Sequence, residues 1–139
     1  MAEQFCVAAL RHLDTAELLE REGKLDDAGY HYGLAGETAV KHAVATACSF
    51  FPSDLRTHFN HRSKPLTEAI LDSQAVTVVL ENGRLGGGLA RDLELRQFAS
   101  RFDKWHINIR YADTDYPVNE ALVAAWKADA VALLAGVVL

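Results

Sequence analysis

The sequence predicts an all-α protein, an up-and-down helical bundle of four main helices with one or two short helices beside them. Apolar residues recur at spacings of three and four along most of the chain, which is the period of an amphipathic helix. The longest such stretch, residues 25–50, has small residues on its apolar face, so neighbouring helices can approach it closely. The chain has 139 residues, so we expect residues 1–139 to form a single domain.

A first helix is predicted over residues 3–22. Its inward face holds Phe5, Ala9, His12, Leu13, Ala16 and Leu19. Glutamates lie mostly off that face, so we expect Glu17, Glu20 and Glu22 to be solvated. Gly23 should end the helix, as glycine commonly does just beyond a C-terminus. The link that follows is so short that the first two helices should pack antiparallel as neighbours.

The central helix is predicted over Leu25–Phe50, and the other helices should pack around it. Its buried face comprises Ala28, Tyr32, Ala35, Ala39, Ala43 and Ala47. Gly29, Gly33 and Gly36 lie inside this helix, where each costs about 1 kcal/mol relative to alanine. We therefore expect each glycine to have a packing reason. Pro52 ends the element because it cannot donate the next helical hydrogen bond.

The middle of the chain predicts a third helix that starts near Pro65 and ends at Asn82. The β-branched run Val76–Val79 leaves a short strand open as the alternative. Gly83–Gly88 is interpreted as a plain loop, since it lacks the Gly-Lys-Ser/Thr ending of a phosphate-binding P-loop. A fourth helix follows over Leu89–Phe102, with its last residue turned inward.

The last helix is predicted over Val118–Val138, started by Pro117. Its buried stripe comprises Leu122, Val123, Trp126, Ala130, Leu133 and Val137. The preceding segment, residues 103–116, is polar and irregular. Its alternating apolar residues, Trp105, Ile107 and Ile109, suit an extended chain that crosses the bundle.

The charge distribution restricts the function classes. The formal net charge of −5 argues against binding of nucleic acid by the whole surface. Residues 56–110 are nevertheless locally basic, with nine Lys/Arg and six Asp/Glu. This bias leaves two interpretations open, a local site for nucleic acid or a chance distribution of charge on a solvated surface.

Several features predict a soluble, cytoplasmic protein. The N-terminus is polar by Glu3, which argues against a signal peptide. The apolar run Ala130–Leu139 is too short for a membrane span, which needs about 20 residues. Cys6 and Cys48 lie in apolar helical contexts, so buried thiols are expected rather than a disulfide.

A series of short motifs runs through the chain in a fixed order. In the central helix they are Asp26–Asp27, Ala28, Tyr30–His31, Gly33–Gly36, Glu37 and Lys41. Later motifs are His61 four residues before Pro65, then Trp105, Arg110–Tyr111 and an alanine-rich last helix. Over residues 5 to 138 this order resembles the HEPN domain family (higher eukaryotes and prokaryotes nucleotide-binding). Trp105 with Arg110–Tyr111 looks closer to its non-catalytic "W…RY" branch.

The resemblance implies a homodimeric binding or regulatory module for a nucleotide, a nucleic acid or a partner protein. Such relatives often act in toxin–antitoxin-type pairs beside a nucleotidyltransferase-like protein. The ligand-binding residues expected here are Lys41, Arg110, Tyr111, Tyr30 and His31. In the structural alternative, Arg110 pairs with the carboxylate of Glu37. The dimer interface expected is the surplus apolar set Phe50, Phe51, Leu55 and Phe59.

The alternative implied by the resemblance is a metal-independent endoribonuclease, whose family motif is arginine and histidine separated by four to six residues. Arg101 and His106 match that spacing. Histidine can move the proton of the RNA 2′-hydroxyl, and arginine can hold the phosphate. Phe102, however, follows the arginine where catalytic relatives usually have a polar residue.

Arg56 and His61 are a second match to the spacing. His61, however, resembles the histidine that many non-catalytic relatives carry just before the third helix, where it looks like a structural cap. His58 and His61 have no cysteine or carboxylate cluster beside them, so neither a metal nor a cofactor is expected.

Overall fold

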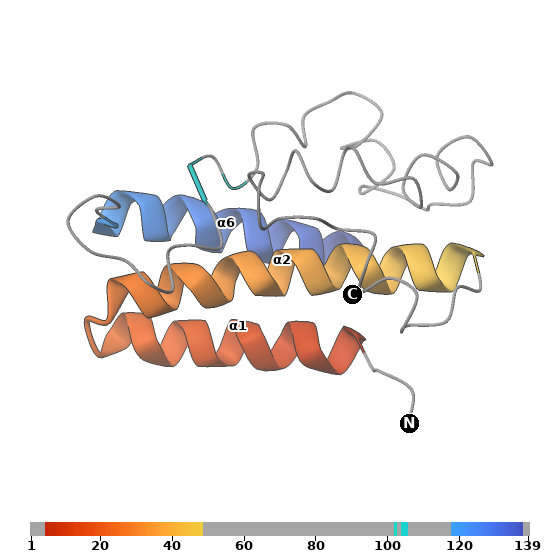
Figure 1. Cartoon of the computed structure of the whole chain (residues 1–139), viewed down its shortest axis with the longest axis horizontal. Coiled ribbons are helices and arrows are strands. Elements are labelled where there is room, and N and C mark those ends of the chain that lie inside the picture. Colours follow the sequence, from red (N-terminus) through yellow and green to blue (C-terminus); the bar gives the residue numbers. More distant parts are fainter. Residues whose placement is uncertain (1–4, 49–101, 103, 106–117, 138–139) are drawn as a thin grey trace.

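The computed structural model describes residues 5–48, 102, 104–105 and 118–137 (Figure 1). This part contains three helices and no strand: α1 (Phe5–Arg21), α2 (Leu25–Cys48) and α6 (Glu120–Val137). The predicted all-α class is therefore confirmed for the described residues. The predicted third helix, its strand alternative and the glycine-rich loop lie outside them. None of the described helices is long and apolar enough to cross a membrane.

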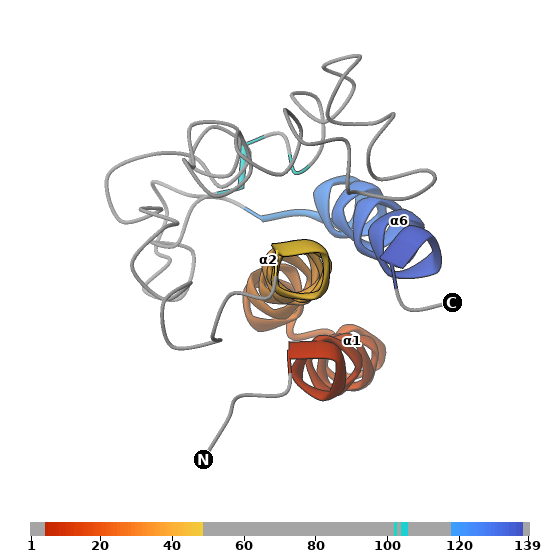
Figure 2. The same cartoon turned by 90° about the vertical axis from the view of Figure 1, so that its right-hand side faces the viewer.

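Helix α2 is the centre of the described structure. It packs against α1 along one side and against α6 along another, whereas α1 and α6 make few contacts with each other. In Figure 1, α2 lies between the other two helices, and the sequence colours show that α1 runs antiparallel to α2 while α6 runs in the same direction as α2. The end-on view of Figure 2 shows α1 and α6 against different sides of α2. The expectation that the other helices pack around α2 is confirmed for α1 and α6.

Helix α1 ends through a backbone motif at Gly23. This residue has a φ of 78°, in the left-handed region that glycine adopts without a steric penalty. Its N–H donates to the carbonyl of Glu20 at 3.0 Å, and the N–H of Lys24 donates to the carbonyl of Leu19 at 2.9 Å. These two bonds are the Schellman arrangement, which satisfies carbonyls at a helix end. The prediction that Gly23 ends the helix is confirmed.

Only part of the predicted inward face of α1 is buried. Phe5, Ala9 and Ala16 are buried, whereas His12, Leu13 and Leu19 are half-buried, because α1 contacts α2 much more than α6. Cys6 is a free thiol and is half-buried, less than expected.

Glu20 was wrongly expected to be only solvated. It is half-buried, and its carboxylate accepts a hydrogen bond of 2.6 Å from the hydroxyl of Tyr32, which ties α1 to α2. Because the carboxylate can turn toward the next helix, its position outside the apolar stripe did not reveal this contact. Glu17 is half-buried and Glu22 is exposed.

The predicted buried face of α2 is confirmed where the structure describes side chains. Ala28, Tyr32, Ala35 and Ala39 are all fully buried. The helix ends at Cys48 in the described chain, and residues 49 and 50 of the prediction lie outside it, as do the side chains of Ala43 and Ala47.

The three glycines of α2 form a flat surface against which aromatic rings pack; we call Gly29, Gly33 and Gly36 the glycine face. A Cβ atom on Gly33 would overlap the indole of Trp105, and one on Gly36 would overlap the ring of Phe102. A Cβ on Gly29 would lie 2.6 Å from Cζ3 of Trp126. The expected packing reason is confirmed for each glycine.

Helix α6 begins two residues later than predicted. Asn119 precedes its first residue, and the Asn119 side-chain oxygen accepts a hydrogen bond of 2.8 Å from the N–H of Leu122. This is an N-cap, and it sets the start of the helix at Glu120. Pro117, the predicted start, lies outside the described residues.

The predicted stripe of α6 is largely buried. Val123, Trp126, Ala130 and Leu133 are buried and Leu122 is half-buried, while the side chain of Val137 is outside the described set. Leu134 is also buried and was missed.

Candidate functional site

A tight turn from Phe102 to Trp105 lies against the glycine face. The N–H of Trp105 donates to the carbonyl of Phe102 at 2.9 Å, which closes the turn. Both aromatic side chains are fully buried, whereas Lys104 is exposed. The prediction that Phe102 faces inward is confirmed. Its φ of 51° is not that of an α-helix, however, so the predicted fourth helix does not continue through this residue.

Two helices hold this turn in place. The indole N–H of Trp105 donates to the carbonyl of Gly29 in α2 at 2.8 Å, and the N–H of Phe102 donates to the carboxylate of Asp129 in α6 at 2.8 Å. Phe102 and Lys104 both have positive φ, at 51° and 68°, which costs energy for residues with a Cβ. The ring packing and the two hydrogen bonds therefore maintain a strained backbone.

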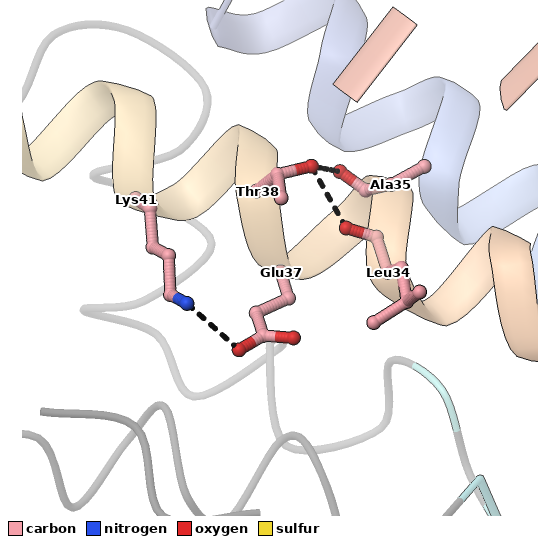
Figure 3. A network of polar contacts seen from close by, with 5 residues as sticks. All are labelled: Leu34, Ala35, Glu37, Thr38 and Lys41. Atoms are coloured by element: carbon pink, nitrogen blue, oxygen red, sulfur yellow. Dashed lines mark hydrogen bonds and ion pairs between the residues drawn. The ribbon is translucent and has the colours of Figure 1, made fainter. Parts of the chain in front are cut away.

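An ion pair between a buried carboxylate and a half-buried lysine lies further along α2. Glu37 is 3% exposed, and its Oε1 lies 3.1 Å from Nζ of Lys41, one turn later (Figure 3). The Lys41 ammonium also lies 5.8 Å from the centre of the Phe5 ring, a cation–π distance that involves α1. Burying charges is costly unless they are paired, so this pair offsets much of the cost of placing Glu37 in the core.

Figure 3 also shows how the neighbouring hydroxyl is satisfied. Thr38 Oγ1 donates to the carbonyl of Leu34 at 2.8 Å and lies 3.2 Å from the carbonyl of Ala35. The hydroxyl is thus bonded to its own helix rather than to the ion pair. Arg110, the partner predicted for Glu37, lies outside the described residues.

The first part of α2 presents Tyr30 and His31, both half-buried. The ring of Tyr30 lies nearly parallel to the indole of Trp105, with an interplanar angle of 13° and centroids 6.4 Å apart. Nδ1 of His31 lies 3.1 Å from Nδ1 of His12 on α1. Burial lowers the pKa of both imidazoles, which favours their neutral forms.

The predicted ligand-binding residues that the structure describes lie at two places on α2. Tyr30 and His31 are adjacent, and Lys41 follows ten residues after His31, about 15 Å further along the helix axis. The other predicted residues, Arg110 and Tyr111, lie outside the described chain. The same is true of the predicted catalytic pair Arg101 and His106, which flank the described turn, and of Arg56 and His61.

The pairing of His12 with His31 was not predicted. The apolar period placed His12 on the inward face of α1, but the register of α1 against α2 decides which residue it meets. The role of Trp105 as an anchor on α2 was likewise missed; the sequence predicted a packing reason for the three glycines but not the aromatic rings that pack on them. Among the described residues, no group of three or more His, Cys, Asp or Glu side chains is arranged to hold a metal ion.

Comparisons with known proteins give no assignment. No family model matches the chain, and no curated protein or solved structure shows significant similarity to it.

Proposed function

We propose that this chain is a cytoplasmic, HEPN-like homodimeric module that binds a nucleotide, a nucleic acid or a partner protein, as part of a toxin–antitoxin-type pair. The ion pair between the buried Glu37 and the half-buried Lys41 of the central helix carries this proposal. A buried ion pair is seldom better for stability than apolar residues of the same volume. Its presence in the core supports a role for Lys41 beyond packing.

The chemistry along α2 suits an anionic, extended ligand. The side chain of Lys41 keeps 13% of its surface exposed and supplies the positive charge. The half-buried ring of Tyr30 is suited to stacking on a base, and His31 is suited to hydrogen bonding. Because about 15 Å of helix separates these two places, an oligonucleotide fits the arrangement better than a single phosphate.

A binding titration tests this proposal. Fluorescence anisotropy with a labelled single-stranded RNA and with mononucleotides should show binding to the purified protein. The Glu37→Gln, Lys41→Gln double variant removes both charges and leaves neither charge unpaired in the core, and it should weaken RNA binding about tenfold, the equivalent of about 1.4 kcal/mol.

Lys24→Gln is the matched control, because Lys24 is an exposed lysine just before α2. It should leave the affinity within about twofold, since one exposed charge adds little at physiological salt. Unchanged affinity in the double variant, or no binding of either ligand, would contradict the proposed ligand class.

The homodimer is supported by apolar side chains on the outer side of α1. Val7, Leu10 and Leu18 are each more than 40% exposed and share one side of the helix. The interface residues that the sequence predicts lie outside the described chain; they are Phe50, Phe51, Leu55 and Phe59. Size-exclusion chromatography with light scattering should give twice the chain mass of 15.3 kDa, and a monomer at micromolar concentration would exclude the dimer.

A second candidate function is the metal-independent endoribonuclease that uses Arg101 and His106. The strained, doubly anchored turn at Phe102–Trp105 favours it, because strained backbone is often found at active sites and this turn lies between the two residues in the sequence. RNA incubated with the protein in chelator should then yield cyclic-phosphate ends. An Arg101→Ala, His106→Ala variant should be inactive; absence of cleavage by the folded wild type excludes this candidate.

A further inference from the structure

A pair of histidines connects α1 to α2. The Nδ1 atoms of His12 and His31 lie 3.1 Å apart, while the ring centroids lie 5.3 Å apart. The centroid separation exceeds the nitrogen separation by roughly the width of one ring, so the two nitrogens point almost directly at each other. One imidazole must therefore donate its Nδ1–H to the lone pair of the other.

This arrangement limits how many protons the pair can hold. In the neutral pair one proton lies between the two Nδ1 atoms. A first added proton goes to the free Nε2 of the donating ring, and the contact remains as a charge-assisted hydrogen bond. A second added proton has only the accepting Nδ1 left to bind. Two N–H groups would then face each other between two positive rings, and the contact must break.

The surroundings of the pair determine the pH at which this happens. Burial lowers the pKa of His12, and His31 and Arg11 lower it further, while the carboxylate of Glu37 on α2 raises it. Burial also lowers the pKa of His31, and Asp27 on its own helix raises it. The carboxylates of Glu37 and Asp27 thus favour one positive charge on the histidine pair. Burial and the repulsion between the two facing rings oppose a second positive charge.

We propose that His12 and His31 form a proton-operated latch between α1 and α2. The latch is closed while one proton lies between the two Nδ1 atoms and opens when both atoms are protonated. Among the described helices, α1 packs mainly on α2 and makes few contacts with α6, so opening the latch should loosen α1 before it loosens α6. Mild acidification would therefore release the part of α1 around His12 while α2 and α6 stay packed. This inference does not depend on the proposed ligand.

The test is a titration of the histidine side chains by nuclear magnetic resonance on the full chain. The pair should titrate in two steps, with apparent pKa values separated by about one unit or more. In His31→Gln the glutamine carbonyl oxygen can accept a hydrogen bond from the Nδ1–H of His12 whether that imidazole is neutral or charged, so His12 should titrate in one step at higher pH. His42→Gln is the matched control, since His42 is a half-buried histidine of α2 outside the pair, and it should leave both steps unchanged.

Amide hydrogen exchange supplies the second readout. Between pH 7 and pH 5, after correction for intrinsic rates, amides near His12 should lose protection in the wild type while those of α6 keep theirs. The His31→Gln variant should show a smaller loss. The proposal is overturned if His12 titrates identically with and without His31, or if protection in α1 does not change with pH.

Discussion

At the scale of single residues, the glycine face explains why α2 carries three residues that weaken an isolated helix. Trp126, Trp105 and Phe102 each occupy the space that a Cβ would need. The cost in helix propensity, about 1 kcal/mol per glycine, is offset by burying large aromatic rings directly against the backbone. The indole of Trp105 adds a hydrogen bond to the carbonyl of Gly29, so its orientation is determined as well as its depth.

Gly33→Ala should lower the free energy of unfolding by about 1–3 kcal/mol, because the new methyl group overlaps the Trp105 indole and overpacking outweighs the gain in propensity. Urea unfolding of the variant and the wild type measures this difference. In a Trp105→Leu background the ring is absent, and the same change should be neutral or stabilising. A more stable Gly33→Ala protein in the wild-type background would show that the indole does not pack as described.

At the scale of elements, local chemistry determines where the helices begin and end. Gly23 terminates α1 through its left-handed conformation, and Asn119 starts α6 through a side-chain cap. The sequence predicts the first of these boundaries better than the second. A glycine after an amphipathic stretch commonly ends a helix, whereas Asn119 and Pro117 are both residue types that are common at a helix start, so the sequence did not show which of them begins α6.

Asn119→Ala should cost about 1 kcal/mol of folding free energy, because the N–H of Leu122 loses its acceptor. Asn119→Asp is the matched control: it keeps the acceptor and adds negative charge at the positive end of the helix dipole, so stability should be retained. Thermal unfolding followed by circular dichroism compares the three proteins. Equal losses in both variants would mean that the cap does not act through its side-chain oxygen.

At the scale of the whole molecule, α2 holds the described bundle together, and its contacts with α1 depend on protonation. Tyr32 donates a hydrogen bond to Glu20, and burial together with that carboxylate raises the pKa of the tyrosine above its usual range. The histidine pair responds on the acid side, where burial lowers both pKa values. The α1–α2 interface is thus most stable between these two titrations.

Stability should therefore fall on mild acidification. The pKa values of His12 and His31 are lowered in the folded protein, so below the ordinary value of 6.5 the unfolded chain binds more protons than the folded one. The free energy of unfolding should be fully maintained above pH 6.5 and should decline as the pH falls from there toward 5. Urea unfolding at a series of pH values measures it, and a His12→Gln, His31→Gln variant should give a flatter profile over that interval. An equally steep profile in the variant would assign the decline to other groups.

The sequence by itself determined the helical class, the three described helices to within about two residues at each end, and most of their buried faces. It also indicated that the glycines of α2 have packing reasons. These are local properties, because hydrophobic period and terminal hydrogen bonds depend on residues only a few positions apart. The binding and catalytic roles of residues such as Lys41 and Arg101 remain predictions.

Only the tertiary structure decided which side chains meet. His12 and His31 are 19 residues apart, and Trp105 is 76 residues from the carbonyl that it bonds. Such pairs depend on the register of α1 against α2 and on where the turn at Phe102–Trp105 docks. That register follows from many packing contacts together, so no local pattern in the sequence specifies it.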